Sequence, residues 1–542
     1  MIKKLKICNF KTYYGMFELE LNQGINILVG NNESGKSTIL EAIHLALTGI
    51  YNGHGIHNEL SSYLFNNQAV KEYLDSLNTQ NKKQPPTITI EVFFEGSDYP
   101  LFEGNFNTEK ANLVSGFQFK IAFSDIYKEE YELLLSKDEI KSLPIEYYEI
   151  SWTTFARSNV TSKSIPIKSV LIDSSNYRYQ NGSDVYISRI VKSILEPQDI
   201  IAISQAHRNM IDIFAENEAI KKINKKINDE STILNGDITL SADLGFKNSW
   251  ENSLVTQIDG IPFSYIGKGA QCVIKTELAL SHKKAQDAGI VLLEEPESHL
   301  SFANLNRLIS SIQQKYMNKQ IIISTHSSYV ANKLGLDKLI LLNDHRVLKI
   351  QELSSSGFFK KMSGYDTLRL ILCKKAILVE GDSDELIVQR AYMDQNQGKL
   401  PIYDGVDVIS VGTAFLRFLE LAKKLNIPVA VVTDNDGDID ALKNKYKEYE
   451  SSDKIKICYD QIVDKGTLQI GLKDYNYNTL EPKLLKENSL ELFNSIFGTT
   501  YTDPDELRKY MKHNKTECAM DIFDSKIKIS YPKYILEAIK ND

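Results

Sequence analysis

The sequence predicts an α/β fold, built from short buried strands that alternate with helices. Three observations predict it. A strand-like run leads through a glycine-rich turn into a helical pattern near the N-terminus, two apolar runs flank a helix in mid-chain, and three more alternate with helices in the last third. These runs lie at 25–29, 290–293, 321–323, 376–379, 406–411 and 428–433. Parallel strands joined by helices collect their carboxyl ends at one sheet edge, and we expect the chemistry there.

Composition narrows the class of protein. A chain of 542 residues is too long for one ordinary domain and predicts about three to four. With 42% hydrophobic and 25% charged residues it resembles a globular protein, and no apolar stretch reaches the roughly 18 residues that cross a bilayer. Its five scattered cysteines predict a reducing, cytoplasmic setting without a disulfide framework or zinc site. The net charge of −8 excludes a global attraction to nucleic acid, so DNA contacts would need local basic patches.

The segment from Gly30 to Ser37 fits the phosphate-binding pattern G-x-x-x-x-G-K-[ST] between a strand and a helix. In that setting backbone N–H groups and a helix N-terminus point at an anion. Lys36 would neutralise the β- and γ-phosphates, and the Ser37 hydroxyl would bind Mg²⁺. Gly35 and Thr38 are predicted to complete the contacts to ATP. The alternative is a chance glycine-rich turn, which the flanking strand and helix disfavour.

The run at 290–293 ends in two glutamates and has the form of a Walker B strand. Glu294 would hold Mg²⁺ through water, and Glu295 would act as the general base on the attacking water. Glu294 stands where an aspartate is usual. Taken alone, the motif is also compatible with solvated carboxylates at a strand end.

Two further elements could complete an ATP site. His326 follows the run at 321–323, one crossover helix after the Walker B strand, where it could sense a γ-phosphate; the alternative is a structural histidine. Gly267 and Gly269 precede a helical pattern whose N-terminus could cap the γ-phosphate of ATP held by another subunit. Most such glycines simply form turns.

In this order the elements resemble the ABC-type ATPase head of SMC and Rad50-like DNA-repair proteins. The resemblance implies a head dimer that sandwiches two ATP molecules between the P-loop of one subunit and the signature loop of the other. Residues 9–11 and Asn32 match positions of that family, and Gln205 is the candidate Q-loop glutamine. The sequence has no long heptad repeat, which argues against an SMC or Rad50 arm. The amphipathic stretch 219–227 predicts either a solvated helix face or a helical insertion used for self-association or DNA contact.

A second chemical centre is predicted in the last third of the chain. Glu380 and Asp384 follow the strand at 376–379, and Asp434 and Asp436 follow the strand at 428–433. On consecutive parallel strands these carboxylates would meet despite their separation in sequence. So many close carboxylates need a cation, and hard oxygen ligands select Mg²⁺ or Mn²⁺. The alternative is ordinary loop aspartates at two strand ends.

This pair of motifs resembles the TOPRIM signature of topoisomerases, primases and certain nucleases. Within one TOPRIM branch, Glu481 and Lys515 match a further metal ligand and a lysine that stabilises charge on the reacting phosphate. Together with the ATPase head, the order resembles the OLD family (overcoming lysogenisation defect) of ATP-linked nucleases, which includes the Gabija nuclease subunit. The expected domains are an ABC ATPase N-terminal part at 1–184, a helical and possibly dimerising insertion at 185–230, an ABC ATPase C-terminal part at 231–360 and a TOPRIM nuclease domain at 370–542, after a polar linker that begins at 351–357.

The predicted function is an ATP-binding and ATP-hydrolysing, Mg²⁺-dependent DNA endonuclease, either a nickase or a double-strand cutter, in anti-phage defence or DNA processing. The alternative is a DNA-binding ATPase switch whose TOPRIM-like domain does not cut. A topoisomerase is disfavoured because no tyrosine-bearing cleavage domain is recognisable, and a primase because no zinc-ligand cluster is present. DNA, a homodimer or higher homo-oligomer and a helicase-like partner subunit are the expected partners.

Overall fold

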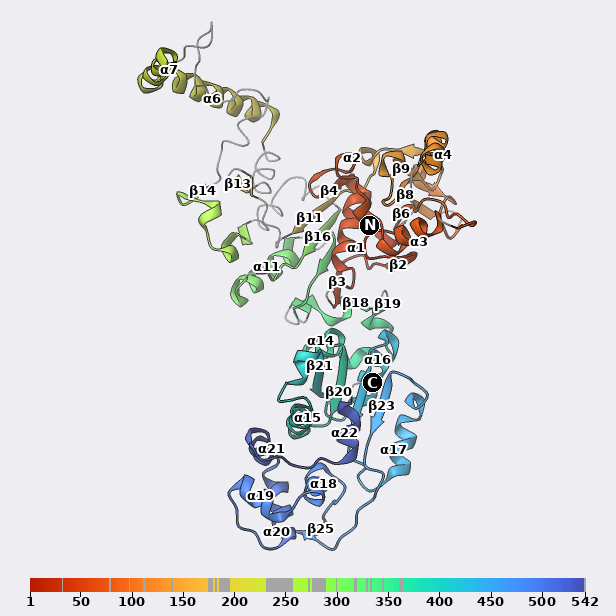
Figure 1. The fold of residues 1–542 in the computed structure, drawn as a ribbon, viewed down its shortest axis with the longest axis vertical. Coiled ribbons are helices and arrows are strands. Elements are labelled where there is room, and N and C mark those ends of the chain that lie inside the picture. The colour runs from red at the N-terminus through yellow and green to blue at the C-terminus, as the bar shows by residue number, and fades with distance from the viewer. Residues whose placement is uncertain are drawn as a thin grey trace. The chain divides into compact units, whose positions relative to one another are not determined.

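The computed structural model describes residues 1–31, 33–77, 79–96, 98–110, 114–137, 140–173, 179–180, 183–184, 195–230, 257–271, 273–274, 289–298, 300–315, 319–327, 330–331, 334–343, 346–359 and 364–540 (Figure 1). The chain divides into two compact units. The first comprises Met1–Asn26 and Ser37–Thr325, and the second comprises Ile27–Lys36 and His326–Asp542. No helix in these described ranges is long and apolar enough to span a bilayer.

An antiparallel sheet forms one part of the first unit. Its strands follow the order β10-β9-β8-β6-β1-β2, and the short β7 (Glu103–Gly104) pairs with β8. Two aromatic side chains of β8, Phe117 and Phe119, are fully buried. The six strands are β10 (Asn159–Val160), β9 (Tyr148–Thr154), β8 (Val114–Phe123), β6 (Ile88–Phe94), β1 (Ile2–Cys8) and β2 (Met16–Glu20).

The predicted Walker B strand lies in a parallel group of the same unit. β16 (Ile290–Glu294) pairs with β11 (Ser169–Asp173) on one side and β17 (Gln320–Ser324) on the other. The crossover helix α11 (Phe302–Lys315) connects β16 to β17. The apolar runs at 290–293 and 321–323 are therefore strands, as predicted, and each is buried over its apolar residues.

The predicted helical insertion forms two helices within the described range. α6 (Pro197–Glu216) and α7 (Glu218–Glu230) meet at Asn217, whose backbone is extended. The Asn217 side chain accepts a hydrogen bond from the backbone N–H of Ala219 at 2.9 Å, so it caps the new helix. The amphipathic pattern at 219–227 therefore lies on a helix, whereas residues 185–194 of the predicted insertion lie outside the described residues.

The second unit begins with the P-loop strand. β3 (Ile25–Gly30) pairs in parallel with β18 (Leu339–Asn343), which pairs antiparallel with β19 (Arg346–Lys349). The polar stretch expected to begin a linker is attached to α16 (Phe415–Leu425). Glu420 of that helix accepts hydrogen bonds from the backbone N–H of Ser354 at 2.7 Å and the hydroxyl of Ser355 at 2.6 Å. This segment is therefore not a free linker.

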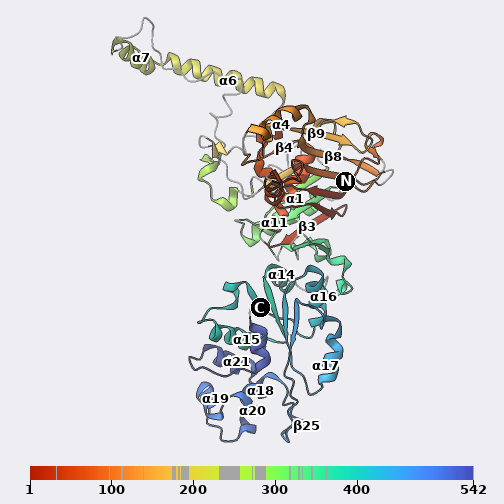
Figure 2. The ribbon, with the colours of Figure 1, turned by 45° about the vertical axis from the view of Figure 1, so that its right-hand side comes forward.

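A four-stranded parallel sheet organises the rest of the second unit. Its order is β21-β20-β22-β23. From β20 the chain therefore continues to β21 on one side, and from β21 it crosses back over β20 to β22 on the other side. Right-handed crossovers in opposite directions place successive helices on opposite faces. Accordingly, α15 and α22 contact each other and the sheet, and α14 and α16 do the same (Figures 1 and 2). The bounds are β20 (Lys375–Val379), β21 (Val406–Ser410), β22 (Val429–Val432), β23 (Ile455–Cys458), α14 (Gly364–Leu372), α15 (Asp382–Gln395) and α22 (Lys533–Ile539).

Short helices complete this unit, and Figure 1 shows α18, α19, α20 and α21 grouped together. They share one apolar core with the sheet, in which Phe493, Leu507 and Ile535 are fully buried. A small hairpin of β24 (Gln469–Ile470) and β25 (Lys473–Asp474) precedes them. The helices are α17 (Ile439–Tyr446), α18 (Leu480–Glu487), α19 (Leu490–Phe497), α20 (Pro504–His513) and α21 (Lys515–Asp524).

Arg390 of α15 fastens α21 to the sheet domain. It is 6% exposed, and it pairs with Asp394 at 3.0 Å. Its guanidinium also donates to carbonyl oxygens at and beyond the end of α21, which have no partner inside that helix. These are the carbonyls of Ile522 at 2.7 Å, Phe523 at 2.8 Å, Ser525 and Ile527 at 3.2 Å.

Arg390→Met is therefore expected to loosen α21 without unfolding the whole chain. Several buried carbonyls and Asp394 would lose a charged donor, so local opening of α21 should become easier by about 2–4 kcal/mol. Hydrogen exchange of the α21 amides measures this directly. Lys533→Met is the control, because Lys533 is 90% exposed in its pair with Glu537. Equal exchange in the two variants would contradict the assignment.

Candidate functional site

The P-loop has the backbone that its motif requires. A Cβ on Gly30 would lie 2.3 Å from the carbonyl oxygen of Leu342, so only glycine fits between β3 and β18. Glu33 and Gly35 have positive φ angles of 69° and 91° and turn the chain sharply before α1 (Lys36–Thr48). Such a turn directs successive N–H groups inward, which is the geometry that binds phosphate.

Lys36 is held within its own loop. Its side chain is buried, and its ammonium donates to the carbonyl oxygens of Gly30 at 2.9 Å and Asn31 at 2.8 Å and to the Ser34 hydroxyl at 3.5 Å. A phosphate oxygen could replace these neutral acceptors with a charged one, which forms the stronger hydrogen bond. Ser37 is exposed at the start of α1.

Thr38, the other predicted contact of this helix, is buried, and its hydroxyl oxygen accepts from that of Thr12 at 3.3 Å. Asn32 lies outside the described residues. Lys36 and Ser37 therefore present the groups that the predicted ATP site needs, and the contact of Thr38 to ATP stays a prediction.

The Walker B strand ends in a constrained turn. Glu294 is the last residue of β16 and is partly buried. Glu295 follows with φ at 41°, an unfavourable conformation for a residue with a Cβ. Its N–H donates to the carbonyl of Ser324 at 3.0 Å, and its carboxylate accepts from the Ser298 hydroxyl at 3.3 Å. Local strain of this kind concentrates at functional sites and agrees with the predicted general base.

The remaining predicted ATPase residues lie in three places. His326 follows Thr325, whose hydroxyl donates to Glu297 at 2.6 Å, just past the Walker B turn. Gly267 is exposed and precedes a helical turn that includes Gly269. Gln205 lies on an exposed face of α6. Lys36 belongs to one compact unit and Glu294 and Glu295 to the other, so their meeting in one ATP site stays a prediction.

The second centre occupies the carboxyl edge of the four-stranded sheet. Glu380 directly follows β20, and Asp434 comes two residues after the neighbouring β22. The chain reverses its direction across the sheet at this point, which is where open α/β sheets form their binding crevices. Asp384 lies in the first turn of α15 and accepts a hydrogen bond from the Gly381 N–H at 3.1 Å. Asp436, at φ 48°, accepts from the Asn476 amide at 2.9 Å.

Electrostatics show that these acids influence one another. The pKa of Asp434 is raised well above its ordinary value, first because the group is buried. The negative charges of Asp384, Glu481, Glu380 and Asp436 then raise it further. Burial, followed by the charges of Glu481 and Glu380, likewise raises the pKa of Asp384 to about 6. The structure therefore brings together the five carboxylates predicted to bind metal in this domain.

Lys515 is the one predicted cation of this centre. Its ammonium lies 3.0 Å from a carboxylate oxygen of Glu481, which is buried in the first turn of α18. Burial lowers the pKa of Lys515, but the charges of Glu481, Asp434 and Asp384 outweigh it and raise the pKa. The Thr479 hydroxyl donates to the other oxygen of Glu481 at 3.2 Å. One lysine thus faces five carboxylates, and most of the negative charge remains uncompensated.

The donor set fits a hard divalent cation. All five candidates are carboxylates, the ligands that Mg²⁺ and Mn²⁺ prefer. Within the described ranges, no three His, Cys, Asp or Glu side chains form a closed metal-ligating group. Unneutralised carboxylates repel one another, which opposes a closed arrangement. A bound cation would remove the repulsion and allow the side chains to rotate inward.

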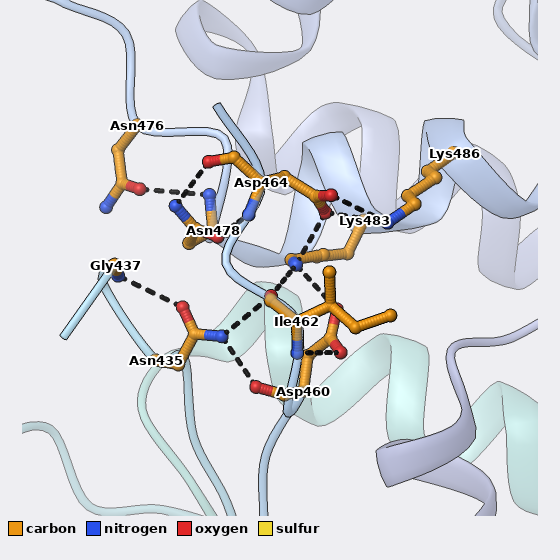
Figure 3. A network of polar contacts seen from close by, with 9 residues as sticks. All are labelled: Asn435, Gly437, Asp460, Ile462, Asp464, Asn476, Asn478, Lys483 and Lys486. Atoms are coloured by element: carbon orange, nitrogen blue, oxygen red, sulfur yellow. Dashed lines mark hydrogen bonds and ion pairs between the residues drawn. The ribbon is translucent and has the colours of Figure 1, made fainter. Parts of the chain in front are cut away.

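Residues that the sequence reasoning missed hold the loops in place (Figure 3). Asn435, between the two aspartates, donates to the carbonyls of Asp460 at 2.6 Å and Ile462 at 3.1 Å. Lys483 is 2% exposed and pairs with Asp460 and Asp464 at 2.5 and 2.6 Å. In the sequence, the only indication of a role for Lys483 was its position on the apolar face of a helix. That position did not indicate which carboxylates it pairs with.

Comparison with known proteins identifies the first part of the chain. Residues 1–331, more than half of the 542, match the family model of the AAA ATPase domain. The chain belongs to the AAA ATPase domain family. Residues 371–436 match the TOPRIM domain model of overcoming lysogenization defect protein-like proteins. The predicted order of an ATPase head and an OLD-type TOPRIM domain is therefore confirmed, and so is the α/β fold class.

Individual proteins are also similar to this chain. "Endonuclease GajA" of Bacillus cereus (strain HuB5-5) is 22% identical over 554 aligned positions, which cover 88% of this chain and 79% of the relative. The solved C-terminal region of the Xanthomonas campestris pv. campestris OLD protein is 21% identical and covers 31% of this chain and 90% of that one, with a TM-score of 0.23. The SMC head domain from Thermotoga maritima is 15% identical and covers 61% and 90%, with a TM-score of 0.26.

The raised pKa of Asp434 predicts that Asp434→Asn stabilises the metal-free protein. An acid whose pKa is raised on folding costs stability once the pH exceeds its unfolded pKa, so the gain, on the order of 1 kcal/mol, should be present at pH 8 and fade towards pH 4. Thermal unfolding in EDTA measures it. Adding Mg²⁺ should stabilise the wild type and not the variant. Asp453→Asn, at an exposed loop position, is the control. A less stable Asp434→Asn protein in EDTA would contradict this account.

Proposed function

We propose that this AAA ATPase–TOPRIM protein is an Mg²⁺-dependent DNA endonuclease whose access to DNA is governed by its ATP-binding head. One observation carries the proposal: five carboxylates, of which Glu481 is buried and Asp384 and Asp434 are partly buried, lie close together with Lys515 at the crevice of a parallel sheet. The proposal is further supported by the match to an OLD-like TOPRIM domain and by the similarity to the protein named "Endonuclease GajA".

Glu380, Asp384, Asp434, Asp436 and Glu481 would hold the metal, with Mg²⁺ as the main candidate and Mn²⁺ as the other. A bound divalent ion supplies Lewis-acid stabilisation of the oxygen atoms of a phosphodiester and lowers the pKa of water. The chain itself supplies position, because the aspartates and glutamates come from rigid strand ends and first helical turns. Burial also strengthens the electrostatic contacts of Glu481, and partial burial those of Asp384 and Asp434.

Lys515 would act on the substrate. Its ammonium stands at the rim of the acid group, half exposed and paired with Glu481. In this position it can bind a non-bridging phosphate oxygen and stabilise the negative charge that develops there during cleavage. Glu481 keeps the ammonium charged and directed at the site. This is the role that the TOPRIM resemblance implies for Lys515.

In the head, Lys36 would bind the β- and γ-phosphates of ATP while Ser37 and Glu294 hold its Mg²⁺. Glu295 would act as the base on the hydrolytic water, and His326 would sense the γ-phosphate. Gly35 and Asn32 would shape the loop. Gly267 and Gly269 would cap the γ-phosphate of ATP bound by a second copy, so the head is proposed to act as a homodimer or within a larger homo-oligomer.

The cellular setting follows from the family resemblance. We propose a cytoplasmic role in anti-phage defence or DNA processing, with DNA as substrate and a helicase-like subunit as partner. The competing hypothesis is a DNA-binding ATPase switch whose TOPRIM domain does not cut. Nicking of supercoiled plasmid separates the two, since only the nuclease converts it to the open-circular form.

Two variants test the separation of chemistries. Asp434→Ala should reduce Mg²⁺-dependent nicking by more than the ~10–100-fold that loss of an outer-shell partner costs, while ATP turnover stays unchanged. Lys36→Ala should abolish ATP turnover and spare nicking measured without nucleotide. Plasmid nicking and phosphate release, assayed on the same preparations, give both numbers. Asp453→Ala serves as the control for the first variant.

Unchanged divalent-dependent nicking in Asp434→Ala would overturn the nuclease assignment. A Lys36→Ala protein that loses nicking as well, even without nucleotide, would mean that the head gates the nuclease through its fold and not only through ATP.

A further inference from the structure

We propose that Lys483 and Asn435 are positioning residues that hold the metal-binding carboxylates in place. Neither residue is a metal ligand. They act through the loop that follows β23, residues 459–464, which we term the brace loop. Figure 3 shows both side chains directed into this loop from opposite sides. The proposal rests on the proposed function in that it explains how the same acidic site is kept ready.

Lys483 ties the brace loop to α18. Its ammonium has three donors and three partners: the carboxylates of Asp460 at 2.5 Å and Asp464 at 2.6 Å, and the carbonyl of Ile462 at 2.8 Å. With its side chain 2% exposed, a lysine this buried is stable only when such partners compensate its charge. The lysine therefore fixes both ends and the middle of a loop that contains no helix or strand.

Asn435 ties the brace loop to the loop that carries the aspartates. It is 3% exposed and lies between Asp434 and Asp436 in sequence. Its amide donates to two brace-loop carbonyls, and its own carbonyl accepts from the Gly437 N–H at 3.0 Å. These bonds fix the backbone between Asp434 and Asp436 and directly after Asp436. The left-handed conformation of Asp436 thereby gains support that an isolated loop would lack.

A pair of asparagines closes the network. Asn478 exchanges two hydrogen bonds with the backbone of Asp464, at 2.7 and 3.0 Å. The backbone N–H of Asn478 donates to the side-chain amide oxygen of Asn476 at 2.9 Å, and the Asn476 side chain in turn donates to the carboxylate of Asp436. The brace loop thus reaches Asp436 by a second route, through side chains that precede α18.

The arrangement links two sets of ligands. Glu481 and Lys483 are two residues apart on α18, so their side chains leave the helix in nearly opposite directions. Glu481 faces the acids and Lys515, whereas Lys483 faces the brace loop and, through Asn435, the strand end that carries Asp434. Displacing the brace loop would therefore move Asp434 and Asp436 relative to Glu481.

Lys486 provides a matched control. It also pairs with Asp464, at 2.7 and 2.9 Å, but its side chain is 43% exposed and donates to no brace-loop carbonyl. If Lys483 contributes only general charge pairing, then Lys483→Met and Lys486→Met should have similar effects. If it positions the ligands, only Lys483→Met should weaken metal binding.

The test is a calorimetric titration of the full-length protein with Mn²⁺ alone, with Asp434→Ala as the variant that defines the site. Lys483→Met should weaken Mn²⁺ binding at that site by about 10–100-fold, the usual cost of losing an outer-shell support, whereas Lys486→Met should stay within about twofold. ATP turnover should be unchanged in both. Equal Mn²⁺ affinities for Lys483→Met and the wild type would overturn the proposal.

Asn435→Ala is the second variant, since it leaves no buried charge unpaired and decides the question if Lys483→Met does not fold. It should weaken Mn²⁺ binding in the same direction, and wild-type affinity would overturn the proposal. A wild type that binds Mn²⁺ at the Asp434-dependent site and never nicks DNA would refute the proposed nuclease while leaving this inference to be judged on the titrations. A wild type with no such Mn²⁺ site would overturn both.

Discussion

The repulsion among close carboxylates is the constraint on which the second unit depends. Asp434 and its four acidic neighbours gain nothing from proximity in the metal-free protein, and the raised pKa values of Asp434 and Asp384 record that cost. Something must therefore hold them together. The rigid carboxyl edge of a parallel sheet, the first turns of α15 and α18, and the hydrogen bonds around Asn435 do so. The apolar core beneath, with Phe493 and Ile535 fully buried, provides the stability that the acidic edge lacks.

The same principle explains why cations surround the site at a distance. Lys515 touches Glu481, and Arg390 fixes the end of the helix that Lys515 begins. Lys483 neutralises Asp460 and Asp464 but stays on the far side of the brace loop. If Lys483 entered the acid group directly, it would occupy the place of a divalent ion. The chain thus separates the cations that shape the site from the space where a cation is needed.

The features that could be predicted from the sequence were those determined by residues close together in the chain. The strand that ends at Glu380, the strand before Asp434 and the loop at Gly30 to Ser37 were predictable, because buried runs that end in polar groups mark strand ends. Glu481 and Lys515 came only from a family resemblance. The roles of Asn435 and Lys483 could not be predicted, because their partners lie more than twenty residues away in sequence or in a neighbouring loop. The identity of a polar side chain does not indicate which residue it will bond. The break at Asn217 was missed for a different reason: a helix period does not reveal where a cap interrupts it.

The two predicted pockets differ in how their key lysines are treated, and the difference bears on mechanism. Lys36 donates to two carbonyls of its own loop, and a charged phosphate oxygen would form a stronger hydrogen bond with it than these carbonyls do. Lys483 is paired with two carboxylates, and moving it would leave buried charges unpaired. A lysine that must release its partners when ligand arrives is suited to a switch, whereas one locked in a buried ion pair is suited to a frame. We therefore expect the head to change conformation when ATP binds. We expect the side chains of the acidic site to keep their arrangement when metal and DNA bind.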